Sequence, residues 1–120
     1  MATILVIDDQ KPIRSLLRAA LEGDAHEVLE AANGRLGLEL YRKRSADLII
    51  TDIEMPEMDG HELMVELTRS FPTVKVIAMS GSLEREGGPN AAKPSGARQT
   101  FQKPFDIRAV LDAVRYELAH

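Results

Sequence analysis

The feature that most constrains this sequence is the alternation of short apolar runs with longer segments of helical periodicity. The run at residues 3–7 is rich in β-branched side chains and lacks polar alternation, which is typical of a strand covered on both faces. Similar runs predict further strands at residues 26–31, 48–51, 74–79 and 98–102. The chain is therefore predicted to contain five strands, each separated from the next by a crossover segment.

Apolar residues between these runs recur at the spacing of one helix face. Ile13, Leu16 and Leu17 begin such a face, and we expect Asp9 to cap this helix and Gly23 to end it. Further faces of this kind lie within residues 34–41, 63–71 and 107–118. Strands that alternate with helices in this way are predicted to pair in parallel, because each parallel return requires a crossover.

We therefore predict an α/β fold: a flavodoxin-like, doubly wound, five-stranded parallel sheet in the order 2-1-3-4-5. The fourth crossover, residues 81–96, departs from the pattern because it contains Gly87-Gly88-Pro89 and Pro94. A proline inside a helix costs about 3 kcal/mol and a glycine about 1 kcal/mol relative to alanine. The fourth helix is accordingly predicted to be short or missing.

Composition limits the classes of function that fit. The 120 residues, 44% of them hydrophobic and 28% charged, predict a single soluble globular domain spanning residues 1–120. The net charge of −4 disfavours direct binding to nucleic acid, and the absence of cysteine excludes disulfides and thiolate metal sites. No apolar run approaches the roughly 18 residues that cross a membrane, and no basic leader precedes the first strand. We therefore expect a cytoplasmic protein without a membrane partner.

Polar residues suited to phosphoryl chemistry follow the predicted strands. They are Asp8 and Asp9 after the first strand, Asp52 after the third, Ser80 after the fourth and Lys103 after the fifth. In an open parallel sheet such residues meet where the strand order reverses. Oxygen ligands without cysteine favour a hard cation such as Mg²⁺, while an ammonium and a hydroxyl group can bind the remaining oxygens. The set predicts a site for phosphoryl transfer to a carboxylate.

At these positions the sequence resembles the receiver domain of two-component response regulators, and the resemblance covers essentially the whole chain. It implies that Asp52 accepts the phosphoryl group and that Mg²⁺ is the cofactor. The implied metal ligands are Asp8, Asp9, Asp52 and the backbone carbonyl of Glu54. Residues 55–60 match the loop that follows the acceptor in this family.

The resemblance also assigns roles at the ends of the fourth and fifth strands. Ser80 fits the family's switch hydroxyl. Lys103 with Pro104 fits its Lys-Pro pair, whose peptide bond is commonly cis. We therefore expect three residues to act on the phosphoryl group: Asp52, Ser80 and Lys103.

One position departs from the family pattern. Many receivers carry a tyrosine or phenylalanine three residues before the lysine, and this sequence has Thr100 there. Phe101 is expected to face the other side of the strand, because successive side chains of a strand alternate. Our hypothesis is that phosphorylation instead orders the segment between Ser82 and Gly96.

The function implied by the resemblance is that of a phosphoacceptor in a two-component or phosphorelay system, in which Mg²⁺-dependent phosphorylation at Asp52 switches protein–protein interactions. The implied donor is a sensor histidine kinase or a histidine phosphotransfer protein, and the downstream target is another protein. Because the last predicted helix ends with the chain, we expect a stand-alone receiver. It would not be an enzyme beyond its intrinsic autophosphorylation and autodephosphorylation.

The alternative is a small aspartate-dependent phosphohydrolase that turns over a metabolite through an aspartyl phosphate. Haloacid-dehalogenase-type phosphatases place the nucleophile in an Asp-x-Asp motif after the first strand, whereas this sequence has Asp8-Asp9-Gln10-Lys11 there. A flavin-binding flavodoxin would need a Ser/Thr-rich phosphate loop at the same place, which here holds carboxylates. The residues after the first strand therefore favour the receiver.

Overall fold

A computed structural model describes residues 1–54, 60–81 and 96–120, and within them a parallel sheet carries two layers of helix. The strands are β1 Thr3–Ile7, β2 Glu27–Ala31, β3 Leu48–Asp52, β4 Val76–Ser80 and β5 Gln99–Gln102. The helices of the described part are α1 Lys11–Gly23, α2 Gly34–Lys43, α3 Gly60–Ser70 and α5 Ile107–Ala119. The predicted α/β class is confirmed.

The sheet has the predicted strand order, β2-β1-β3-β4-β5, and all of its pairings are parallel. β1 lies between β2 and β3, with Ile7 opposite Ala31 on one side and Thr51 on the other. The chain therefore reverses its direction of winding beside β1. In an α/β sheet this is the place where a ligand site forms.

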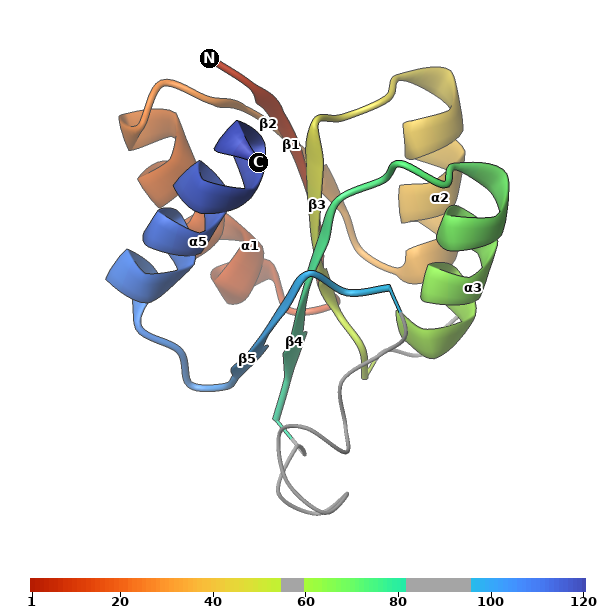
Figure 1. The fold of residues 1–120 in the computed structure, drawn as a ribbon. Helices are drawn as coiled ribbons and strands as arrows, with labels where there is room; N and C mark the ends of the chain where they lie inside the picture. Colours follow the sequence, from red (N-terminus) through yellow and green to blue (C-terminus); the bar gives the residue numbers. More distant parts are fainter. Residues whose placement is uncertain (55–59, 82–95) are drawn as a thin grey trace.

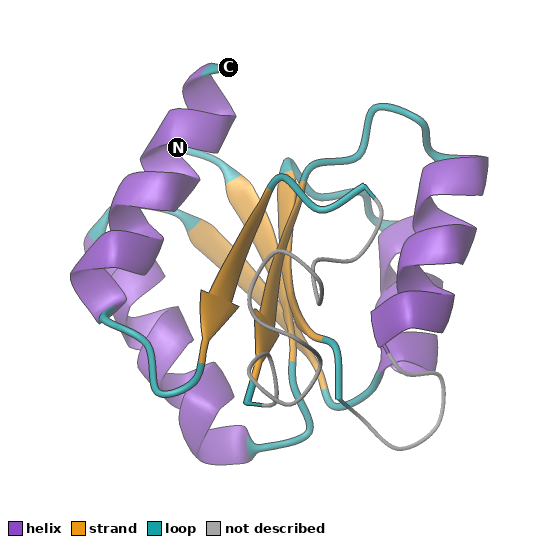
Figure 2. Ribbon diagram, turned by 60° about the horizontal axis from the view of Figure 1, so that its bottom comes forward, coloured by secondary structure: helices purple, strands orange, loops and turns teal. Residues whose placement is uncertain are grey.

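Two helical layers cover the two faces of the sheet: α1 and α5 lie on one face, and α2 and α3 lie on the other (Figures 1 and 2). Successive strand residues alternate between the two cores, as the pleat requires. Leu5 and Ile7 of β1 join the core beneath α2 and α3, whereas Ile4 and Val6 join the core beneath α1 and α5. Burial on both faces explains why the strand sequences are apolar without alternation.

The helix face predicted within residues 34–41 is confirmed as the buried face of α2. Its buried members are Gly34, Gly37, Leu38 and Tyr41. Gly37 packs so closely against β1 that a side chain at this position would collide with Ile7. The glycine thus sets the distance between the helix and the sheet.

The predicted cap of the first helix is wrong. Gln10 holds the N-cap position of α1, without a side-chain cap hydrogen bond. Asp8 is the acid that forms a hydrogen bond in this turn: its Oδ1 accepts from Gln10 N at 2.8 Å. The turn between strand and helix is therefore closed by the buried acid, which leaves Asp9 outside the helix. The helix ends at Gly23, as predicted.

The predicted fourth helix and the proposed ordering of its segment concern residues 82–95, which lie outside the described residues. So do residues 55–59 of the segment that resembles the family's loop. Within the described ranges no helix has both the length and the apolar character needed to cross a membrane. Both termini lie at the amino ends of the strands (Figure 1).

Candidate functional site

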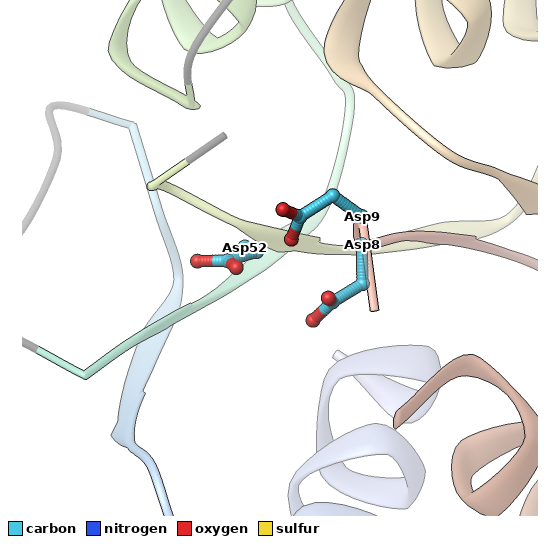
Figure 3. A group of neighbouring side chains, drawn as sticks. All are labelled: Asp8, Asp9 and Asp52. Carbon is cyan, nitrogen blue, oxygen red and sulfur yellow. The ribbon is translucent and has the colours of Figure 1, made fainter. Parts of the chain in front are cut away.

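Three carboxylates meet at the carboxyl ends of β1 and β3. Because Ile7 pairs with Thr51, the next residues, Asp8 and Asp52, leave their strands side by side. One oxygen each of Asp8, Asp9 and Asp52 lies within 4.8 Å of the others. Figure 3 shows the three side chains gathered where the two strands end. The sequence prediction that these acids converge is therefore confirmed as geometry.

The three acids differ in burial. Asp8 is 0% exposed and Asp52 is 4% exposed, whereas Asp9 is open to solvent. A cation at this place would be reached from the side of Asp9, with the two buried acids behind it. Carboxylate oxygens at this spacing fit a hard divalent cation such as Mg²⁺, which binds through one or two carboxylates and keeps open positions for other oxygens.

Lys103 places a single positive charge between the two buried acids. It follows β5, and its backbone N–H donates to Ser80 O at 2.8 Å, which fixes the chain there against the end of β4. Its Nζ donates to Asp8 Oδ2 at 2.8 Å and to Asp52 Oδ2 at 3.0 Å. The Lys103–Pro104 peptide bond is cis. One ammonium thus serves two carboxylates from separate strands.

Burial and hydrogen bonding shift the pKa values of Asp52 and Lys103. Burial raises the pKa of Asp52 above its usual value, and the hydrogen bonds from the Glu54 backbone N–H and from Lys103 only partly offset this. Burial acts in the opposite sense on the ammonium, but the hydrogen bonds to Asp8 and Asp52 outweigh it, so the pKa of Lys103 is raised. The lysine therefore stays charged, and the site keeps an excess of negative charge.

Ser80 and Glu54 form a second contact across this edge. Ser80 ends β4 and is fully buried. Its Oγ donates to Glu54 Oε1 at 2.9 Å, and Gly81 N donates to the same oxygen at 2.8 Å. Glu54 also donates from its backbone N–H to Asp52 Oδ1 at 2.9 Å. The residue two positions after the predicted acceptor therefore bridges β3 and β4.

The prediction that Phe101 and Thr100 face opposite sides of the fifth strand is confirmed. Thr100 pairs with Ala78, a member of the core beneath α2 and α3, whereas Phe101 packs against the core beneath α1 and α5. Phe101 is therefore on the opposite face and does not replace the aromatic ring. Thr100 Oγ1 is buried, and no hydrogen-bond partner for it is found in the part of the chain that the structure describes.

The structure brings all the sequence-predicted site residues to one edge of the sheet. An open pocket at this edge is lined by Asp9, Gln10, Asp52, Glu54, Gly81 and Lys103. From the sequence, Glu54 was expected beside the site, with its backbone carbonyl as a metal ligand. The contact of its carboxylate with Ser80 Oγ and the participation of the Gly81 N–H were not predicted. The available signal was a glycine directly after a strand end, which leaves a backbone N–H accessible.

The chain is similar to known proteins in both sequence and fold. The response regulator receiver domain family matches residues 4–115. Sporulation initiation phosphotransferase F of Bacillus subtilis is 35% identical over 114 residues, which cover 93% of this chain and 90% of that protein. KDP operon transcriptional regulatory protein KdpE of Escherichia coli is 38% identical over 118 residues, covering 98% of this chain but only 52% of that protein.

A solved structure matches nearly the whole chain. It is the response regulator protein TrrA of Thermotoga maritima in complex with Mg²⁺-BeF, with a TM-score of 0.85 and 28% identity. The match covers 98% of this chain and 99% of that one. The likeness therefore extends over all three layers of the fold.

Proposed function

The chain belongs to the response regulator receiver domain family, and we propose that it accepts a phosphoryl group at Asp52 and thereby switches its binding to another protein. The observation that carries this proposal is the meeting of Asp8, Asp9 and Asp52 at one strand edge, with Lys103 bonded to two of them. Proteins of this family act in signalling. A phosphoacceptor role gives the three aspartates, Ser80 and Lys103 a common function.

Magnesium is the proposed cofactor. Asp8, Asp9, Asp52 and the backbone carbonyl of Glu54 would hold it, and the TrrA structure with Mg²⁺-BeF supports this choice. The ion would offset the negative charge that gathers on the phosphoryl oxygens during transfer. The donor set fits because it offers hard oxygen atoms and an exposed side at Asp9.

The proposed reaction follows from the position of Asp52. A carboxylate oxygen attacks the phosphorus of a phosphohistidine, an O–P bond forms, and the P–N bond breaks with its electron pair returning to the imidazole nitrogen. Lys103 already bonds to Asp52 Oδ2 and would then donate to the phosphoryl oxygens. Ser80 Oγ, at the end of the neighbouring strand, is the proposed further donor. Water later attacks the phosphorus, releases inorganic phosphate and restores the carboxylate.

The proposed donor is a sensor histidine kinase or a histidine phosphotransfer protein, and the proposed target is an unidentified protein. The name of the Bacillus subtilis relative, a phosphotransferase, supports a place in a phosphorelay. The net charge of −4 supports a protein target over direct nucleic acid binding. The same charge favours a target with a basic docking face.

Intact-mass measurement tests the proposal. The protein is incubated with Mg²⁺ and acetyl phosphate, and we expect a mass increase of one phosphoryl group. The increase should be lost with EDTA and in Asp52→Asn. An adduct that persists in Asp52→Asn would refute the assignment. Release of many equivalents of phosphate per protein from a range of metabolites would instead indicate a phosphohydrolase.

A second variant tests the proposed role of the lysine. Lys103→Ala removes the only cation that bonds to Asp52 within the described residues. We expect phosphorylation by acetyl phosphate to slow by about tenfold or more, because a charge-assisted hydrogen bond to the phosphoryl oxygens is lost. Lys75→Ala serves as the control, because Lys75 bonds to the carbonyl of Glu117 instead. Equal rates for the wild type and Lys103→Ala would exclude the role.

A further inference from the structure

The Glu54 carboxylate occupies two hydrogen-bond donors at the end of β4. A single oxygen, Oε1, accepts from both Ser80 Oγ and Gly81 N. These two donors stand at the end of β4, beside the strand that carries Asp52, and Asp52 pairs with Met79 just before them. A hydroxyl and a backbone N–H that converge on one point form an anion site, and here a side chain of the same protein fills it.

The position of Glu54 makes this contact compatible with its other bond. Its backbone N–H is tied to Asp52 Oδ1 at 2.9 Å, so the residue is fixed beside the acceptor. Its side chain then extends from the end of β3 to the end of β4. The residue is exposed as a whole, so its side chain can leave the contact and enter solvent without disturbing the core.

A phosphoryl group and the Glu54 carboxylate are both negatively charged, so they would not occupy the Ser80 and Gly81 donors together. A phosphoryl group on a side chain carries about −1.5 to −2 charges near neutral pH and has three acceptor oxygens. The edge already holds three aspartates against the ammonium of Lys103. A phosphoryl group and the Glu54 carboxylate would therefore repel each other while competing for the same two donors.

We propose that the Glu54 side chain is a built-in competitor of the phosphoryl group: it occupies the Ser80 hydroxyl and the Gly81 N–H in the unphosphorylated protein and must leave when Asp52 is modified. The inference rests on the function proposed above. Glu54 is thus a positioning residue that holds the end of β4 in its resting arrangement. It also lowers the affinity of the site for phosphoryl groups.

Beryllium trifluoride with Mg²⁺ is the probe, because it imitates a phosphoryl group without covalent transfer. Binding is followed by ¹⁹F NMR in the wild type and in Glu54→Ala, Glu54→Asp and Glu54→Gln. We expect Glu54→Ala to lower the half-saturating concentration about tenfold, because the donors no longer have to be vacated. Glu39→Ala, which removes an exposed glutamate on α2, should behave as the wild type.

Glu54→Asp and Glu54→Gln distinguish the effect of occupying the two donors from the effect of the negative charge. Glu54→Asp keeps the charge but is one methylene too short to reach both donors, so competition predicts tighter binding than in the wild type. Glu54→Gln loses the charge but keeps an oxygen that can accept both hydrogen bonds, so its gain should be smaller than that of Glu54→Ala. Glu54→Asp binding like the wild type, together with Glu54→Gln binding like Glu54→Ala, would overturn the proposal.

A second readout uses the free protein and needs neither Mg²⁺ nor a phosphoryl donor. The Gly81 amide resonance should shift in Glu54→Ala, and the amide should exchange faster with solvent, because its acceptor is gone. An unchanged Gly81 resonance would overturn the proposal even if Asp52 is phosphorylated normally. If the wild type gains no phosphoryl group while Gly81 responds as expected, the proposed function fails but the Glu54 contact stands.

Discussion

Two carboxylates of this protein are equally buried at opposite ends of the sheet, yet their surroundings differ. Asp52 at the carboxyl end and Glu117 at the amino end are each 4% exposed. Glu117, on α5, accepts from Gln99 Nε2 at 2.9 Å and lies 3.6 Å from Arg98 Nη1. Its carboxylate has partners of its own, so it ties the last helix to the edge of the sheet.

Asp52 must share its partner. Lys103 bonds to it and to the fully buried Asp8, and the carboxylate of Asp9 lies nearby. Burial therefore raises the pKa of Asp52 without full compensation. Equal burial therefore does not give the two carboxylates the same electrostatic surroundings. The number of cations available to each acid decides how far its negative charge is compensated, and the incompletely compensated Asp52 is the acid suited to the proposed metal ion and phosphoryl group.

The largest expected effect is the response to magnesium, which should act on the acidic end only. At a concentration about a hundred times its dissociation constant, Mg²⁺ should raise the free energy of unfolding by about 2.7 kcal/mol. Urea unfolding with and without Mg²⁺ measures this gain. Asp9→Asn should lose most of it, because Asp9 contributes an oxygen to the cluster. An equal gain in Asp9→Asn would place the ion elsewhere.

The next effect concerns the structural acid. Glu117→Ala should lower the free energy of unfolding by about 2 kcal/mol, because Gln99 Nε2 loses its acceptor and Arg98 loses its counter-charge. Urea unfolding at neutral pH is the measurement. Glu117→Gln, which keeps an acceptor oxygen, should lose less. If the alanine variant is as stable as the wild type, Glu117 does not hold α5 to the sheet.

Asp52→Asn should act in the opposite direction and stabilise the protein at neutral pH without Mg²⁺, by less than the loss expected in Glu117→Ala. The folded-state pKa of Asp52 is raised above its ordinary value of 3.8, so folding favours the protonated acid. That stability is present below pH 3.8 and is lost as the pH rises through the folded-state pKa. The two proteins should therefore unfold alike in acid and diverge toward neutral pH, and a constant difference at every pH would contradict this account.

The smallest expected effect belongs to the surface pair of Asp24 and Arg115, whose arginine also bonds to the exposed Asp112. Asp24 accepts from Arg115 Nε and Nη2 at 2.9 Å, and this hydrogen bonding lowers the pKa of Asp24. Its stability contribution is present above the ordinary pKa and is lost as the pH falls through the lowered one. Asp24→Asn should cause a slight destabilisation near neutral pH that shrinks in high salt, measured by thermal unfolding. Insensitivity to salt would argue against an electrostatic origin.

Much of the fold was predictable because apolar residues recur along the sequence with the periods of strands and helices. The apolar runs of β1 and β3 predicted a sheet buried on both faces, and the helical spacing within residues 34–41 predicted the inner face of α2. The convergence of Asp8 and Asp52 followed from strand order alone. What depends on topology was therefore accessible from the sequence.

What depends on side-chain conformation was not accessible. The cap assigned to Asp9 was wrong because the buried Asp8 already binds Gln10 N, a choice that is set by burial and not by residue type. Nothing in the sequence says that the Glu54 side chain reaches Ser80. The burial of Glu117 did leave a signal, because it lies seven residues after Val110 on the same helix face, but its charge made it resemble a surface residue.

The placement of the termini has a practical consequence. Because both ends of the described chain lie at the amino ends of the strands, a protein anchored to a sensor chip through either end would turn its acidic edge toward the solution (Figure 2). Docking of the proposed phosphodonor protein could then be recorded without the anchor obstructing the approach. A fluorescent label at either end would likewise report the rotational diffusion of the protein without contacting the acidic edge.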